Sequence, residues 1–370
     1  MLYKIKLNKD IFFYIGLIIQ IFYVLRIITI NLYANSEIYT ALIIIFFSIS
    51  ILLNKYNEKE IIIMAILLLC ALIHLYKTYD MNLLRIVMLI FAGKGINIHK
   101  FKKFLAIIYP LTFFGVWFLS QYYNLNTIYQ ENVWRTSVGW ETRYTFGFDG
   151  PTRMMFIWIC CIVSIQIYTH KINLIRDLTF LIFSIYLFSV SISYTGIVVA
   201  ILAICLPYGC RFLENCKDSK VLKFLIPITL LIVLGLTFIA SFINISQTSL
   251  GKLLNGRTFY LYHLIAIGVY PSLFGSHFSI KVAGLDNSYF YNFYILGIVP
   301  MIIMLIAIIK LGKVYYKKRD FIGLSCTAVF IIMAYVTQTF EVPFLNYFLF
   351  LIIENWKEII NINFVKSNLG

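Results

Sequence analysis

Residues 178–207 read LTFLIFSIYLFSVSISYTGIVVAILAICLP and contain no charged residue. About twenty apolar residues cross the hydrocarbon core of a bilayer as a helix. This stretch could therefore be one long tilted helix, or two short helices that turn near SISYTG at 191–196. The whole chain is similarly apolar, since 61% of its 370 residues are hydrophobic, 13% are charged and the mean hydropathy is +0.87. Soluble domains carry about 25% charged residues, so the composition indicates a membrane protein.

Apolar runs bounded by charged or turn residues recur along the entire chain. The expected spans are residues 11–30, 37–53, 61–76, 81–93, 104–121, 154–169, 178–192, 195–209, 221–241, 288–309, 321–337 and 343–356. A bilayer offers the backbone no hydrogen-bonding partner, so apolar spans of this length are helical. The sequence therefore predicts an all-α fold: a single polytopic domain over residues 1–370, built as a helical bundle of about twelve transmembrane helices.

Basic residues orient this bundle, because short loops rich in Lys and Arg stay in the cytoplasm. With the N-terminus inside and the spans alternating, 22 of the 31 Lys and Arg residues lie on the cytoplasmic side and 7 lie outside. One long helix over 178–207 would place the basic stretches 211–223 and 310–319 outside, so two helices are favoured. The same count makes residues 259–274 an outer-face or re-entrant segment. We expect a multi-pass protein of the bacterial cytoplasmic membrane with both termini in the cytoplasm.

Charge, cysteine and motif patterns narrow the possible partners. The net charge of +15 comes from short Lys and Arg clusters between apolar runs, which indicates contact with anionic membrane lipids and no nucleic acid partner. The seven cysteines form no CxxC pair, so free thiols are expected. The sequence has no HxxxH, no Cys/His cluster and no P-loop, so neither a metal nor a cofactor is expected.

Two long outer loops, residues 122–153 and 242–288, are rich in aromatic residues and glycine. Loops of this length are usually functional or disordered, and this composition is not typical of disorder. We therefore expect both loops to fold over the outer mouth of the bundle. Arg143 and Arg257 lie in them beside glycine and aromatic residues. Because a guanidinium binds phosphate through two parallel hydrogen bonds, these two are the candidate ligands for a lipid-linked diphosphate.

Other cations allow two interpretations. Arg135, Arg153 and Lys252 fit plain solvated charges of the outer loops as well as weak substrate contacts. Arg26 and Arg85 lie within expected spans, where a charge indicates either a functional interior or a nearby membrane interface. The sequence favours neither interpretation for these two arginines.

Outer-loop carboxylates and a histidine are candidates for acceptor positioning or for proton transfer. They are Asp149, Asp286 and His277, although a lone histidine near an interface is more often a hydrogen-bonded structural residue. Asn287 and Tyr289, which follow Asp286, are further weak candidates for substrate binding.

Four short stretches of the chain together resemble a known family of membrane enzymes. They are RYTFGFDGP at 143–151, SYTG at 193–196, NGR at 255–257 followed by LFG at 273–275, and LDNSY at 285–289. In order, spacing and outer location they are similar to motifs of the Wzy family of O-antigen and capsular polysaccharide polymerases, within the O-antigen polymerase/ligase superfamily. The chain departs from the family pattern at Gly150, Thr152 and Tyr194, where the family has His, Asn and Arg.

This resemblance implies a GT-C-like membrane glycosyltransferase that needs no metal. Its substrates would be undecaprenyl-diphosphate-linked oligosaccharide repeat units, which it would join into O-antigen or capsular polysaccharide on the outer face. Its partners would include a flippase and a chain-length regulator. A related O-antigen ligase and a lipid-linked oligosaccharide flippase or other transporter are the alternatives, although no internal repeat of the kind found in transporters is present. A purely structural membrane scaffold is another alternative function. The aromatic outer loops favour an active protein over a scaffold.

Overall fold

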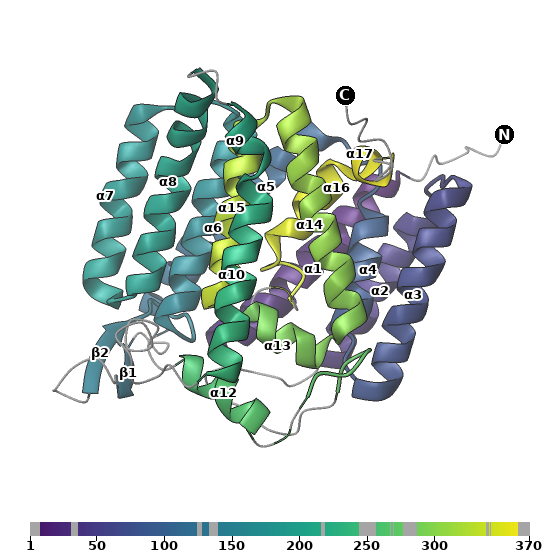
Figure 1. The fold of residues 1–370 in the computed structure, drawn as a ribbon, viewed down its shortest axis with the longest axis horizontal. Helices are drawn as coiled ribbons and strands as arrows, with labels where there is room; N and C mark the ends of the chain where they lie inside the picture. The colour runs from purple at the N-terminus through teal and green to yellow at the C-terminus, as the bar shows by residue number, and fades with distance from the viewer. Residues whose placement is uncertain are drawn as a thin grey trace.

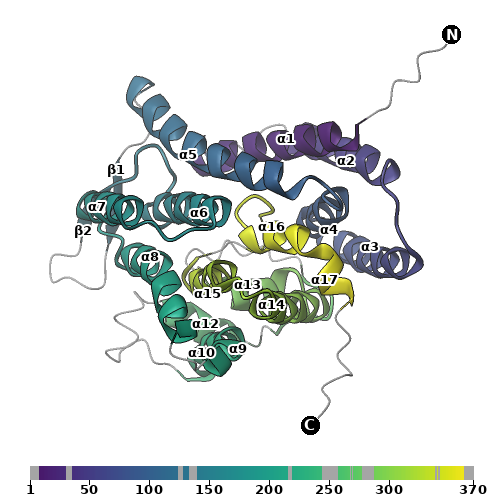
Figure 2. The same ribbon diagram turned by 90° about the horizontal axis from the view of Figure 1, so that it is seen from above.

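The computed structural model is a bundle of helices with one small two-stranded sheet (Figures 1 and 2). It describes residues 8–30, 36–123, 128–132, 140–215, 219–243, 257–266, 268, 270–276, 287–337, 340 and 342–361. The elements of the first half are α1 (Lys9–Ile30), α2 (Ser36–Leu52), α3 (Glu58–Thr78), α4 (Asn82–Ala92), α5 (Ile98–Tyr122), β1 (Ile128–Asn132), β2 (Trp140–Tyr144), α6 (Pro151–Thr169) and α7 (Leu174–Ser191). The second half contains α8 (Tyr194–Asn215), α9 (Ser219–Lys223), α10 (Leu225–Phe242), α12 (Arg257–Ala266), α13 (Ser288–Ile295), α14 (Ile298–Lys318), α15 (Phe321–Val336), α16 (Tyr347–Glu354) and α17 (Trp356–Asn361).

The helices have the length and composition of membrane spans. Among the described residues, seven helices are long and apolar enough to cross a bilayer, and α2, α4 and α15 are shorter apolar helices. Large apolar side chains also cover the outside of the bundle, including Leu231 at 73% and Ile182 at 69% exposure. Exposed aliphatic side chains on successive helices suit a hydrocarbon solvent. The chain is therefore a helical multi-pass membrane protein, as the sequence predicts.

The two ambiguous apolar stretches are resolved. Residues 178–207 form two helices, α7 and α8, and Ile192 between them has a left-handed backbone with φ 51°. The predicted turn is confirmed. Among the described residues of 259–274, regular helix is limited to α12, whose ten residues are only about 15 Å long. This is half of a hydrocarbon core, so the expectation that this segment does not span is also confirmed.

Three predicted spans are wrong as continuous helices. The span 221–241 is divided at Phe224, between α9 and α10. The span 288–309 is broken between α13 and α14 by Gly297, which has φ 96°. A Cβ at this glycine would lie 2.3 Å from the backbone nitrogen of Gly275, so the close approach of two backbones forces the break. The span 343–356 is helical only from Tyr347 onward. The non-helical residues before Tyr347 are enclosed by protein; Phe344 and Leu345, for example, are 0% and 3% exposed.

The predicted all-α fold does not include the β-hairpin that the described chain has in its first outer loop. Strands β1 and β2 pair antiparallel, with Tyr129 opposite Arg143. Figure 1 shows this hairpin at the same end of the bundle as α12 and α13. We call that end the hairpin face. The opposite end carries α9, α17 and the turns that contain Lys55, Lys94 and Lys171, and we call it the basic face.

Candidate functional site

The turn from β2 into α6 is fixed against α5 by aromatic packing. Phe146 stacks on Trp117 with ring centroids 4.5 Å apart, and Phe148 stacks on Phe113 at 5.8 Å. Phe146 itself has φ 48°, an unusual conformation for a bulky side chain, which this packing holds in place. The sequence motif at 143–151 is therefore a packed structure at the hairpin face.

Two cations and a carboxylate belong to this packed turn. Arg143 of β2 is buried, with 4% of its surface exposed. Arg153, in the first turn of α6, donates to Oδ2 of Asp149 over 2.6 Å. Burial raises the pKa of the Asp149 carboxyl to about 6, although the positive charge of Arg153 opposes the shift. We call this region the β-turn corner.

A second polar region lies where α3, α4 and α1 meet, and its central residue is Arg85. This arginine is 3% exposed and lies in the first turns of α4. Its Nη2 donates to the amide oxygen of Asn82, and its guanidinium carbon lies 4.5 Å from the centre of the Tyr23 ring. Asn82 in turn donates to Asp80 over 3.1 Å. The local sequence thus orients the guanidinium through a short chain of polar contacts.

Several hydrogen-bonding groups in this region have no partner among the described residues. The Nε and Nη1 atoms of Arg85 are buried without a hydrogen bond. The same holds for both polar atoms of Gln20, a fully buried residue of α1 that precedes Tyr23 by three positions and so lies on a neighbouring part of that helix surface. Because buried donors nearly always have partners, unmet donors on a permanent cation indicate a site for a polar or anionic ligand. We call this region, formed by Gln20, Tyr23, Asn82 and Arg85, the α4 corner.

A packed segment of the second outer loop borders the end of α3. His74 of α3 is fully buried, and its Nδ1 lies 3.0 Å from the carbonyl oxygen of Phe274. Its Nε2 lies 3.2 Å from the hydroxyl of Thr78. A Cβ at Gly275 would lie 1.9 Å from the carbonyl oxygen of Ile295. The LFG stretch at 273–275 is therefore fixed between α3 and the break that precedes α14.

Two predicted substrate contacts have structural partners. Asn287 accepts a hydrogen bond from the backbone of Phe290 as the N-cap of α13, and it donates to Thr237 over 3.1 Å. Tyr289 is fully buried and donates to the carbonyl oxygen of Ile331 over 3.0 Å. Both side chains therefore join α13 to α10 and α15.

Other predicted site residues lie outside the described part of the chain. Arg135, His277 and Asp286 belong to this group, and Arg257 is described only as the first residue of α12, without its side chain. Their roles stay predictions. Sequence reasoning missed His74 and Gln20, which are single polar residues within apolar runs. It left the role of Arg85 open. A polar residue inside an expected span is the one signal that could have identified all three.

Comparison with known proteins identifies no relative of this chain. No protein-family model matches the chain, and neither a curated protein nor a solved structure matches it.

Proposed function

We propose that this protein is a membrane glycosyltransferase that joins lipid-linked oligosaccharide repeat units into a polysaccharide. In this proposal the bundle crosses the bacterial cytoplasmic membrane about twelve times, and the hairpin face is the outer face. The proposal rests on the resemblance of the motifs at 143–151, 255–257, 273–275 and 285–289 to the Wzy family. The location of these motifs supports it, because β2, α12 and α13 lie together at the hairpin face (Figure 1).

The observation that carries the proposal is the buried guanidinium of Arg85 with two unmet nitrogen donors. A lipid diphosphate is an anion with several acceptor oxygens, which would satisfy such donors. Leaving donors of a buried charged group unmet costs more than about 1–3 kcal/mol, so a ligand that meets them gains this free energy. Arg143 is a second buried cation of the hairpin face.

The chemistry that follows is a displacement at an anomeric carbon. The hydroxyl of the acceptor sugar attacks the anomeric carbon of the growing chain, and the bond from this carbon to the diphosphate oxygen breaks. The diphosphate leaves with the bonding electron pair, and the arginines stabilise its negative charge. The hydroxyl proton passes to a carboxylate. Asp149 is the candidate that the structure describes, because a pKa of about 6 leaves it ionised at neutral pH.

The test is the glycan length in cells that carry Arg143→Ala, Arg257→Ala or a gene deletion. We expect each arginine variant to insert normally but to leave single repeat units without long chains. Arg→Lys at either position should restore little, because lysine lacks the two-pronged donor geometry. Normal long chains in both alanine variants would refute the site. Labelling from the outside should reach cysteines introduced at position 144, which is exposed beside Arg143, and at position 257, and cytoplasmic labelling of both would refute the orientation.

The deletion phenotype separates this enzyme from its alternatives. Loss of long chains with single units still attached to their final acceptor points to a polymerase. Loss of all attached units would instead favour an O-antigen ligase or a lipid-linked oligosaccharide flippase.

A further inference from the structure

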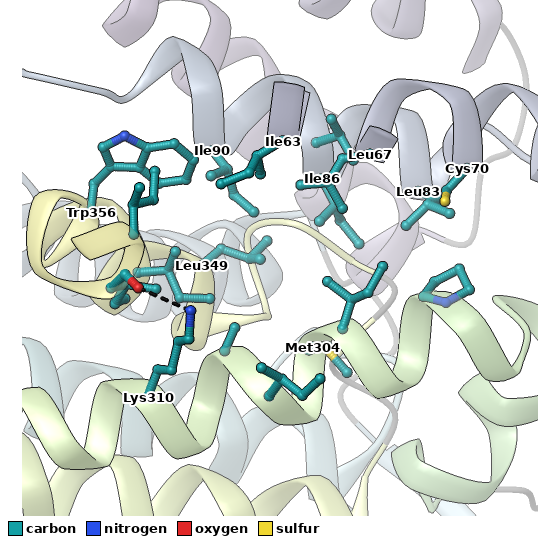
Figure 3. A pocket seen from close by; sticks show the side chains of 18 of the residues that line it. Ile63, Leu67, Cys70, Leu83, Ile86, Ile90, Met304, Lys310, Leu349 and Trp356 are labelled. Carbon is teal, nitrogen blue, oxygen red and sulfur yellow. Dashed lines mark hydrogen bonds between the residues drawn. The ribbon is translucent and has the colours of Figure 1, made fainter. Parts of the chain in front are cut away.

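An apolar groove runs along the side of the bundle between α3 and α14, with α4, α16 and α17 behind it. Its volume is about 210 Å³. Figure 3 shows the side chains that line it, among them Ile63, Leu67, Ile90 and Met304. Among the described residues that line it, Lys310 is the single charged one. The groove therefore offers a hydrocarbon surface over nearly all of its length.

The length of the groove matches one leaflet of a bilayer. Along α14 it extends from Pro300 to Lys310, which corresponds to about 15 Å of helix. The hydrocarbon of one leaflet is also about 15 Å thick, half of the bilayer core. Lys310 marks the end toward the basic face, where its amine donates to the carbonyl oxygen of Ile359 over 3.3 Å. From Lys310 the groove runs toward the hairpin face, where Leu83 near the start of α4 and Pro300 near the start of α14 line it.

A cationic pocket of about 390 Å³ adjoins this end of the groove. Lys55, Lys94 and Lys357 line it, and Ile360 lines both the pocket and the groove. Its carboxylate, Glu60, is already engaged.

The contacts of Glu60 engage the one carboxylate among the described residues that line the pocket. Lys94 forms an ion pair with Glu60 at 2.5 Å, and the indole nitrogen of Trp356 donates to Glu60 over 2.9 Å. No other carboxylate is among the described residues that line the pocket. Lys55 and Lys357 are exposed there, so the pocket has an excess of positive charge beside a hydrocarbon groove.

We propose that groove and pocket together bind one anionic phospholipid of the leaflet next to the basic face. An acyl chain lies in the groove, and the phosphate lies over Lys55 and Lys357. Basic pockets between transmembrane helices on the cytoplasmic side are typical sites for anionic headgroups. A phosphate is favoured over a neutral headgroup because the described lining of the pocket holds three lysines and one carboxylate. The headgroup pocket is separate from the sugar-transfer motifs, since it lies at the basic face while β2, α12 and α13 lie at the hairpin face (Figure 1).

The experiment measures lipid retained by the full chain. The protein is purified in mild detergent after incubation with vesicles of phosphatidylcholine and phosphatidylglycerol in equal amounts, and bound lipid is counted by native mass spectrometry. We expect preferential retention of phosphatidylglycerol. The double variant Lys55→Gln and Lys357→Gln should reduce this retention on the order of 30-fold, about fivefold for each lysine.

Two further variants separate headgroup from chain recognition. Ala307→Trp places a large side chain in the groove and should also abolish retention, whereas Lys103→Gln, an exposed lysine of α5 outside the pocket, should retain the lipid like the original protein. Equal retention of both lipids, unchanged retention in the double lysine variant, or unchanged retention in Ala307→Trp would each refute the site. Recovery of a polyprenyl diphosphate in place of the phospholipid would refute the assigned occupant.

Discussion

Arg153 of the β-turn corner and Arg85 of the α4 corner both lie near the hairpin face, but their charges are in different surroundings. In the β-turn corner, Arg153 is partly exposed and paired with Asp149 at 2.6 Å. In the α4 corner, Arg85 is almost fully buried, contacts a neutral amide and an aromatic ring, and has two donors unmet. A paired, partly exposed cation contributes mainly to local structure. A buried cation with free donors is the arrangement that binds an anion, so the two corners predict different consequences of substitution.

The largest expected effect comes from Arg85→Gln. Removing a preorganised donor at a site of developing charge lowers rates about 100-fold or more. We expect formation of chains longer than one repeat unit to fall by this factor, measured in membrane vesicles at matched protein levels. Arg153→Gln is the matched control in the β-turn corner and should reduce the rate less than about threefold. The reverse ranking of the two variants would remove the distinction between the corners.

Gly275→Ala tests whether the packed LFG stretch supports the α4 corner. Gly275 has φ 85°, and an added Cβ would clash with the carbonyl oxygen of Ile295. Strain of this kind costs about 1–3 kcal/mol, so the thermal midpoint of the detergent-purified protein should fall. Gly235→Ala on α10 is the control, because no atom lies within 4 Å of its added Cβ. Equal midpoints for the two variants would contradict the close backbone contact.

The pH dependence probes the β-turn corner. Burial raises the pKa of Asp149 to about 6, so its carboxyl gains charge as the pH rises through about 6. If Asp149 is the base, the rate should rise up to about tenfold per pH unit below this value and then level off. Asp149→Asn should abolish this rise, and an identical profile for the variant would exclude the role.

The raised pKa of Asp149 also affects stability, and here the expected change with rising pH is a decrease, whereas the rate is expected to rise. Between its ordinary pKa of 3.8 and about 6, the folded carboxyl keeps its proton longer than the unfolded one. The free energy of unfolding therefore decreases as the pH rises through this window, and Asp149→Asn should remove that decrease. Urea titrations at pH 4 and pH 7 measure it, and an unchanged difference between the two pH values would show that Asp149 is not the cause.

The smallest expected effect is the stability change caused by Arg153→Gln. Ion pairs with partly exposed partners contribute about 0–1 kcal/mol, and the two side chains are 33% and 25% exposed. The thermal midpoint should therefore shift by only a few degrees. A shift as large as that of Gly275→Ala would mean that the β-turn corner depends on this pair for its structure.

Local features of the fold could be predicted from the sequence, but contacts between distant segments could not. The turn within residues 178–207 follows from charge placement alone, and α7 and α8 confirm it. The break at Gly297 depends on contact with Gly275, which no local pattern of apolar residues reveals. The β1–β2 hairpin was also missed, because its short strands lack a regular alternation of apolar and polar residues.

The candidate site shows the same division. The motif containing Arg143 and Asp149 could be identified from its residue types. The α4 corner could not, because Gln20 and Arg85 are far apart in the chain and only helix packing brings Tyr23 of α1 over the guanidinium. An arginine in an apolar run indicates function or an interface equally well, and only its burial and unmet donors distinguish the two.

The enclosed segment before α16 has a consequence for biogenesis. Tyr109 of α5 donates to the carbonyl oxygen of Phe344 over 2.8 Å in the interior, and Figure 2 shows α16 surrounded by other helices. The centre of the bundle is thus filled by a segment that follows α15 in the chain. A chain that stops after α15 would lack this central filling, so the bundle is complete only after α16 has been translated.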